Sequence, residues 1–94
     1  MIYVICTNKV NKDNVKTFTD AAIEHARLSL QQDDGCIRFD ISKYNEEYNE
    51  ITFFEQWESK EMLDKHSIRC KSSPLIKIIN ENRYDKNIKV YEIL

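Results

Sequence analysis

The chain has 94 residues and a formal net charge of −2, from 14 basic and 16 acidic residues. This length allows one hydrophobic core, so we expect a single domain over residues 1–94 that is either marginally stable or stabilised by a second subunit. The two signs of charge are interspersed, which gives no electrostatic reason to expect binding to nucleic acid or to an anionic membrane. No apolar run approaches the roughly 20 residues of a membrane span, and no signal-peptide pattern is present.

The three cysteines are odd in number and share no metal-ligand spacing; they are Cys6, Cys36 and Cys70. We interpret them as buried or free thiols, which are typical of the reducing cytoplasm, so we expect a cytoplasmic protein. The sequence has no phosphate-cradling glycine loop, no Ser-His-Asp set and no cluster of metal ligands, so we expect no bound metal.

The first third of the chain predicts a strand followed by a helix. Residues 1–7 form a β-rich apolar run, and apolar residues from Val15 to about Gln31 keep helical spacing. We expect His25 to lie in solvent at the border of this apolar stripe, with the mouth of a pocket as the alternative. Gly35 can adopt the left-handed backbone that ends a helix.

Two strands joined by a polar loop at residues 45–49 are predicted next. Residues 36–44 alternate, with Ile37, Phe39 and Ile41 on one face. The following strand carries an alternating set on one face, composed of Ile51, Phe53, Glu55 and Trp57. Phe54 lies on its opposite face, so we expect both sides of this strand to be covered.

The last part of the chain predicts two helices and a strand. Ser59 is a typical N-cap of a helix that reaches His66, and Leu63 and His66 share one face of it. Residues 67–73 are indistinct. Ser73-Pro74 then opens a second helix, since proline is well tolerated at the first helical position. Residues 87–94 close the chain as a strand.

The predicted order is β-α-β-β-α-α-β, a split βαβ pattern that is typical of α+β, ferredoxin-like sandwiches. If the helices cover one face of the sheet, the other face, which carries Phe54, needs cover too. A second copy of the chain is the simplest cover.

Three sequence features together resemble the antibiotic biosynthesis monooxygenase (ABM) family over roughly residues 1–80. They are Gly35-Cys36-x-Arg38-Phe39-Asp40, Glu55-x-Trp57-x-Ser59, and His66. The resemblance implies a homodimer whose sheets pack face to face as a dimeric α/β barrel, with a pocket between sheet and helices in each subunit. Family enzymes oxygenate small reduced aromatic substrates such as quinols without metal or flavin, so no cofactor is expected; relatives isomerise small metabolites or degrade haem.

His66 matches the histidine of the family, and we predict it to be the catalytic residue. An imidazole with an ordinary pKa near 6.5 can take a proton from a phenol, and the phenolate is a far better electron donor to O₂. The alternative is a structural histidine that is bonded to a backbone carbonyl.

Four further residues are predicted to bind the substrate. Phe39, Phe53 and Trp57 are suitable walls for a flat aromatic ligand, although such residues also serve as plain core. Glu55 points to the same side, where a buried carboxylate must be paired or have a raised pKa. We expect Arg38 or a backbone amide to be its partner.

The sequence therefore predicts a cofactor-independent monooxygenase that acts on a small quinol-like substrate. The alternative is a non-catalytic ligand-binding or metabolite-isomerising protein of the same fold. Extra residues between His66 and Leu75, and the lack of an arginine before Gly35, depart from the family pattern and favour this alternative. An RNA-recognition domain shares the element order, but the chain lacks the basic surface and the aromatic motif that such a domain needs.

Overall fold

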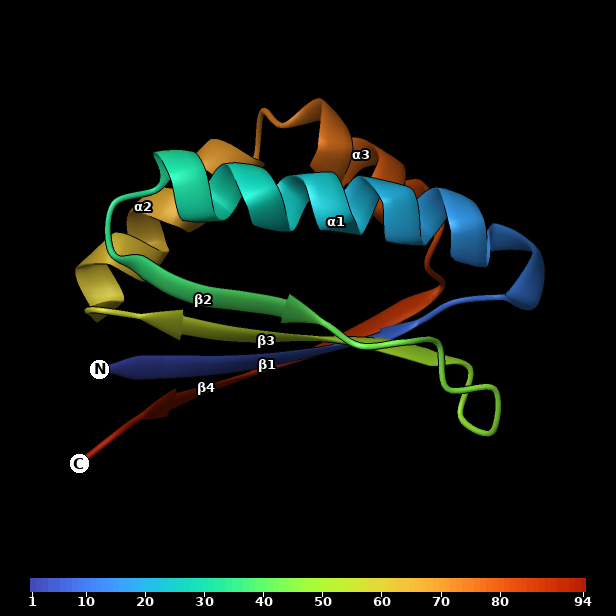
Figure 1. Cartoon of the computed structure of the whole chain (residues 1–94), viewed down its shortest axis with the longest axis horizontal. Coiled ribbons are helices and arrows are strands. Elements are labelled where there is room, and N and C mark those ends of the chain that lie inside the picture. Colours follow the sequence, from blue (N-terminus) through green and yellow to red (C-terminus); the bar gives the residue numbers. More distant parts are fainter.

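A four-stranded antiparallel sheet carries three helices on one of its faces (Figure 1). The computed structural model describes all residues, 1–94. In chain order the elements are β1 (Ile2–Lys9), a short 3₁₀ turn (Lys12–Asn14), α1 (Val15–Gln32), β2 (Cys36–Ile41), β3 (Glu50–Trp57), α2 (Lys60–Cys70), α3 (Pro74–Glu81) and β4 (Asp85–Glu92). The strand order β2-β3-β1-β4 confirms the predicted α+β, ferredoxin-like fold.

The central strand β1 sets which side chains face the helices. It pairs with β3 on one side, with Val4 opposite Glu55, and with β4 on the other, with Val4 opposite Val90. Directly opposed residues point to the same face of a sheet. The buried residues of β1 and β3 therefore share the helical face, and Ile88 and Val90 of β4 point to that face as well.

The alternation predicted for β2 is wrong at its first apolar position. The register between β2 and β3 shifts between Cys36 and Arg38, which indicates a β-bulge. A bulge inserts an unpaired residue and re-aims its side chain. Ile37 is consequently 44% exposed, whereas Phe39 is buried as predicted.

The turn between α1 and β2 depends on Gly35. Its φ of +80° lies in the left-handed region, as predicted, although α1 already ends at Gln32 with Asp33 as its C-cap. A Cβ at this position would lie 2.6 Å from Cγ of Met62. Only glycine therefore allows the start of β2 to pack against the first turn of α2.

Helix α2 begins where the sequence predicted and extends one turn beyond His66. The Ser59 side chain accepts a hydrogen bond from the backbone N–H of Met62, which confirms it as the N-cap. The first residues of the indistinct segment 67–73 continue this helix, which ends at Cys70. Residues three and four positions apart share a helix face, so Arg69 and Cys70 lie beside His66.

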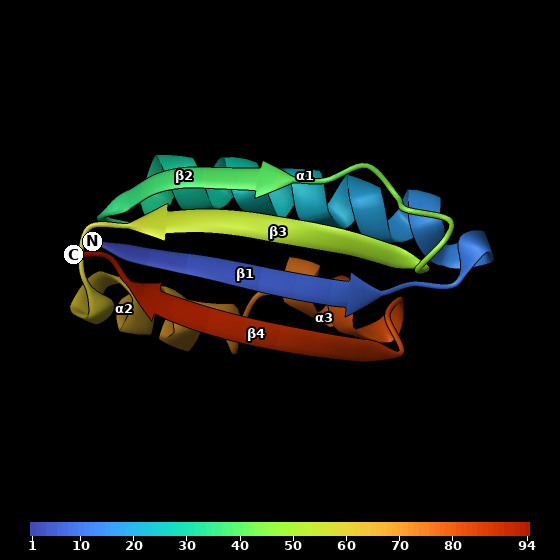
Figure 2. The same cartoon turned by 90° about the horizontal axis from the view of Figure 1, so that it is seen from below.

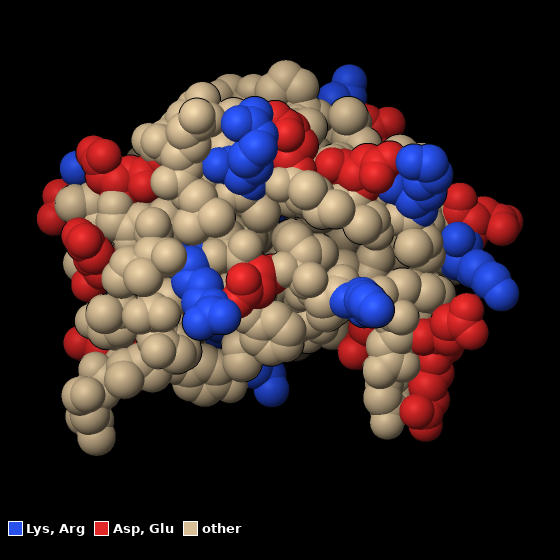
Figure 3. Space-filling model, in the orientation of Figure 1, with Lys and Arg blue, Asp and Glu red and all other residues tan.

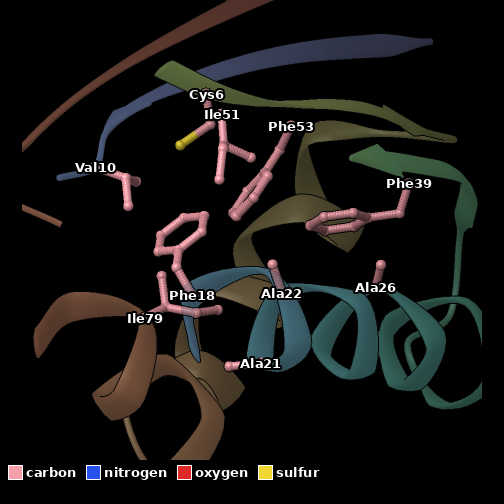
Figure 4. Packing of buried hydrophobic residues seen from close by; sticks show 10 residues of the cluster. All are labelled: Cys6, Val10, Phe18, Ala21, Ala22, Ala26, Phe39, Ile51, Phe53 and Ile79. Carbon is pink, nitrogen blue, oxygen red and sulfur yellow. The ribbon is translucent and has the colours of Figure 1, made fainter. Parts of the chain in front are cut away.

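Helix α3 also begins as predicted, with Ser73 as its N-cap and Pro74 in its first turn. Its Ile79 is fully buried and joins the main core between α1 and the sheet (Figure 4). Figure 4 shows Phe18, Phe53 and Phe39 in succession between α1 and the strands. The ten buried residues of this core are Cys6, Val10, Phe18, Ala21, Ala22, Ala26, Phe39, Ile51, Phe53 and Ile79.

No helix covers the second face of the sheet, which Figure 2 shows from below. Tyr3, Phe54 and Tyr91 are 43–45% exposed and lie on this open face, together with the ion pair between Arg38 and Asp40. The sequence predicted that both sides of β3 are covered, but no other part of the same chain covers Phe54. Acidic and basic side chains are interspersed on the surface that Figure 3 shows. No helix is both long and apolar enough to cross a membrane.

Candidate functional site

A cavity of about 1080 Å³ lies between the helical face of β1 and β4 and the two short helices α2 and α3. Figure 2 shows α2 and α3 behind β4, at the edge of the sheet away from α1. The sheet side of the cavity is apolar and includes Val4, Cys6, Ile88 and Val90. Ile88 and Val90 are 52% and 45% exposed because no helix packs directly on β4. The uneven cover of the sheet therefore creates the cavity.

His66 lines this cavity and is held by Asp33, the residue that follows α1. Nδ1 of His66 lies 2.6 Å from Oδ2 of Asp33. The same carboxylate accepts two hydrogen bonds from Arg69, at 2.6 and 2.8 Å. The side chains of His66 and Asp33 are each only 8% exposed, so this pair is shielded from solvent.

The Asp33 contact determines which nitrogen of His66 carries the proton. Burial raises the pKa of Asp33, but the hydrogen bonds from Arg69 and His66 together have the larger, opposite effect. The pKa of Asp33 therefore lies below its ordinary value. An ionised carboxylate only accepts hydrogen bonds, so Nδ1 of His66 carries the proton. Burial and the charge of Arg69 together lower the pKa of His66 by more than the Asp33 carboxylate raises it. The ring is therefore neutral near pH 7, and the lone pair lies on Nε2, where the Cys70 thiol donates to it across 3.3 Å.

His25 is buried, so its expected position in solvent is wrong. Its exposed fraction is 2%, and its ring packs edge-on against Phe39 with 5.3 Å between the ring centroids. The ring of His66 lies equally close, at 5.3 Å. Burial, followed by the charge of His66, lowers the pKa of His25 to about 4. A neutral second imidazole thus lines the cavity, buried within it rather than at its mouth, where the sequence alternative placed it.

Glu55 is buried in the same cavity, and its partner is Trp57 rather than Arg38. The indole N–H of Trp57 donates to Oε1 of Glu55 across 3.0 Å. Arg38 lies on the open face of the sheet, where it pairs with Asp40. Burial raises the pKa of Glu55 to about 7, although the indole hydrogen bond opposes this. The carboxyl group is therefore partly protonated at neutral pH.

Four of the five predicted site residues line the cavity: Phe39, Phe53, Glu55 and His66. Trp57 does not line it. Its side chain is fully buried with Ile2, Val4 and Leu63, and its ring lies 4.6 Å from that of His66. Trp57 therefore contacts Glu55 and His66 from the interior of the protein, and its side chain has no exposed surface that a ligand could contact.

Sequence reasoning missed Asp33, Arg69, Cys70 and Arg83. Had the helix been extended past His66, its three- and four-residue spacing would have indicated Arg69 and Cys70. No local signal marks Asp33, which lies 33 residues before His66 and was assigned only to a turn.

Several basic residues line the cavity. Arg83 donates to the amide oxygen of Asn8 across 2.7 Å and to that of Asn80, and it forms no ion pair. Lys71, Lys77 and Lys86 also line the cavity and form no ion pair. Glu81 lines the cavity without an ion pair as well, so these four basic groups outnumber the free exposed carboxylate beside them.

The comparison with protein families decides where the chain belongs. A family model described as antibiotic biosynthesis monooxygenase matches residues 1–68, from β1 through most of α2. The chain belongs to this family. The matched residues include every site residue that the sequence predicted, whereas α3, Arg83 and β4 lie beyond the match. No curated protein matches the chain.

Solved structures share the fold over the whole chain. A crystal structure of an antibiotic biosynthesis monooxygenase is 18% identical, with a TM-score of 0.81, and the match covers 100% of this chain and 99% of that one. A conserved protein from Methanosarcina mazei Go1 is 25% identical, with a TM-score of 0.79 and coverage of 96% and 89%. A conserved protein from Bacteroides thetaiotaomicron VPI-5482 is 23% identical, with a TM-score of 0.81 and coverage of 98% and 96%. These similarities show that the chain shares the ABM fold over its whole length.

The raised pKa of Glu55 predicts how stability depends on pH. Because its pKa rises from 4.5 to about 7 on folding, its contribution is fully present below pH 4.5 and is lost as the pH rises to about 7. The loss in the free energy of unfolding is on the order of 3 kcal/mol. Glu55→Gln should remove this loss, because glutamine does not titrate. The free energy of unfolding of the variant, relative to that of the wild type, should therefore be higher at pH 8 than at pH 5. Urea unfolding at both pH values measures the difference.

The pH dependence of the variant must be compared with that of the wild type, because His25 changes the stability of both with pH and in the opposite direction to Glu55. Its pKa falls from 6.5 to about 4 on folding, so its contribution is lost as the pH falls through that range. Glu55 in turn raises the pKa of the thiols of Cys6, Cys36 and Cys70, although burial is the larger cause for each of them. Glu58→Gln changes an exposed carboxylate just beyond β3 and is the matched control. If Glu55→Gln and Glu58→Gln behave alike, the assignment of the raised pKa to Glu55 is wrong.

Proposed function

We propose that this ABM-family protein is a cofactor-independent monooxygenase of small quinol-like substrates, with His66 as the general base. The observation that carries the proposal is the Asp33–His66 pair, which leaves a neutral imidazole with its Nε2 lone pair at the wall of a cavity. Phe39 and Phe53 line the same cavity and suit a flat aromatic ring.

The proposed reaction begins with proton transfer from a phenolic O–H of the substrate to Nε2 of His66. The resulting phenolate donates electrons to O₂. One oxygen atom replaces hydrogen at a ring carbon and the other leaves as water, so that a hydroquinone and O₂ give a hydroxyquinone and water. The substrate supplies all four electrons, and the balance needs no further reductant.

Asp33 and Glu55 have separate parts in this proposal. The Asp33 carboxylate stabilises the imidazolium that forms when His66 accepts the proton, since the two groups are 2.6 Å apart and shielded from water. Glu55, with a pKa of about 7, holds a proton in the same cavity and is the group that returns one to the departing water.

A second candidate is binding or isomerisation of an anionic metabolite without O₂. The basic groups of Arg83, Lys71, Lys77 and Lys86 in the cavity lining outnumber the unpaired carboxylate of Glu81 there and favour this candidate, because a neutral quinol does not require positive charge for binding. Thermal-shift measurements with neutral hydroquinones and with small carboxylated or phosphorylated sugars and acids separate the candidates. Stabilisation by the anions alone, without oxygen uptake, would favour the second.

Oxygen consumption by the purified chain tests the first candidate. With a panel of hydroquinones in buffer that contains a chelator, the wild type should consume O₂ faster than the spontaneous reaction. His66→Gln should lower kcat/KM by roughly 100- to 10,000-fold, which is the usual contribution of a general base. Lys65→Gln, an exposed neighbour on α2, is the control and should keep the activity. Equal rates for wild type and His66→Gln would refute the assigned role.

We also propose that the protein is a homodimer that buries the open faces of two sheets against each other as an α/β barrel. The exposed Tyr3, Phe54 and Tyr91 on a face that no helix covers support this. Sedimentation should give twice the 11.2 kDa chain mass, and Phe54→Glu should shift it to the monomer. Tyr48→Glu, in the exposed loop before β3, should leave the dimer intact. A wild-type monomer at micromolar concentration would contradict the proposal.

A further inference from the structure

Three side chains that can each bind a metal ion converge at the inner end of the cavity. One ring nitrogen of His25, one of His66 and the sulfur of Cys70 all lie within 4.8 Å of one another. His66 and Cys70 come from the same face of α2, four residues apart, and His25 comes from α1. Nε2 of His66 lies 3.3 Å from Sγ of Cys70.

We propose that His25, His66 and Cys70 form a binding site for a divalent transition-metal ion, with Zn²⁺ as the ion that suits the donors best. Two imidazoles and a thiolate are a typical donor set for zinc, and the mixture disfavours the hard ions Mg²⁺ and Ca²⁺. When the ion binds, the Cys70 thiol loses its proton to solvent and the sulfur becomes the ligand.

The distances fit a tetrahedral ion after a small adjustment. Zinc bonds of about 2.0–2.1 Å to nitrogen and about 2.3 Å to sulfur place tetrahedral ligand atoms roughly 3.5 Å apart. The pair formed by His66 and Cys70 already has this separation. The remaining separations, at most 4.8 Å, need a movement of about 1 Å, which ring rotation of His25 can supply.

The surroundings of His66 match those of a metal ligand. A ligating histidine almost always donates its second ring N–H to a carboxylate, which fixes the ring and leaves the other nitrogen for the ion. Asp33 provides this contact at 2.6 Å, and Arg69 in turn holds Asp33 with two hydrogen bonds. Nε2 therefore points its lone pair toward Cys70 and away from Asp33.

His25 supplies an independent observation. Its Nδ1 is the only buried side-chain nitrogen or oxygen in the chain that has no hydrogen-bond partner. A buried polar atom without a partner is costly and calls for an explanation. The side chain is 2% exposed and neutral at pH 7, so its ring is ready to act as a ligand without losing a proton.

Three protein ligands leave a fourth position on the ion. All three residues line the cavity, so this position is open to water or to a small ligand. A bound ion would occupy Nε2 of His66 and would thereby suppress the proton transfer of the proposed oxygenase. The binding itself does not depend on that activity, so the two proposals can fail separately.

The experiment is a titration of the reduced, chelator-treated full chain with Co²⁺, followed by Zn²⁺. We expect one Co²⁺ per chain, with a thiolate-to-cobalt charge-transfer band that disappears when Zn²⁺ displaces the cobalt. Cys70→Ser should abolish the band, His25→Asn should weaken Co²⁺ binding at least about tenfold, and Asp33→Asn should weaken it roughly 10- to 100-fold. Cys36→Ser, at a half-buried thiol outside the cluster, is the control and should retain the band.

X-ray absorption on the zinc-loaded wild type provides a readout that does not depend on whether a variant folds. One sulfur and two imidazole nitrogens in the first shell would support the site. A shell without sulfur, a failure to bind Co²⁺, or a charge-transfer band that persists in folded Cys70→Ser would overturn the proposal.

Discussion

The arrangement of the site depends on one buried carboxylate. Asp33 ends α1, and its two oxygens accept hydrogen bonds from His66 and Arg69 on α2, so it ties the turn after the first helix to the second helix. The carboxylate is buried yet remains ionised because two donors surround it. Without it, the buried His66 N–H would have no partner, a cost of roughly 1–3 kcal/mol. Arg69, whose side chain is 30% exposed, would lose its two hydrogen bonds to the carboxylate and keep only the one to Ser29. One contact thus serves both the packing of the helices and the state of the histidine.

The cavity follows from how unevenly the helices cover the sheet. The long helix α1 packs over β2 and β3, while α2 and α3 lie beyond it and leave β4 without direct cover (Figures 1 and 2). Ile88 and Val90 point to the helical side and stay half-exposed. The result is a cavity with an apolar floor, whose lining also contains two neutral imidazoles and several basic residues. These features are the basis of the proposals for a small aromatic or a small anionic ligand.

Local sequence patterns predicted the elements because each has a local cause. Alternation identified β3, and Ser59 and Ser73 identified the starts of two helices. Local patterns failed where a distant contact decides the outcome. Periodicity placed His25 at the edge of a stripe, but the Phe39 and His66 rings that bury it come from other elements. The partner of Glu55 was mistaken because Arg38 alternates to the opposite face.

The central claim is that Asp33 holds His66 as the neutral tautomer with its proton on Nδ1 and its lone pair on Nε2. Both the proposed base and the proposed metal ligand require this state. Long-range ¹H–¹⁵N correlation spectra of the metal-free, ¹⁵N-labelled protein at neutral pH report the state of each imidazole directly. The account predicts a protonated Nδ1 and an unprotonated Nε2 for His66, and loss of this preference in Asp33→Ala. An imidazolium, or a proton on Nε2, in the wild type would contradict it.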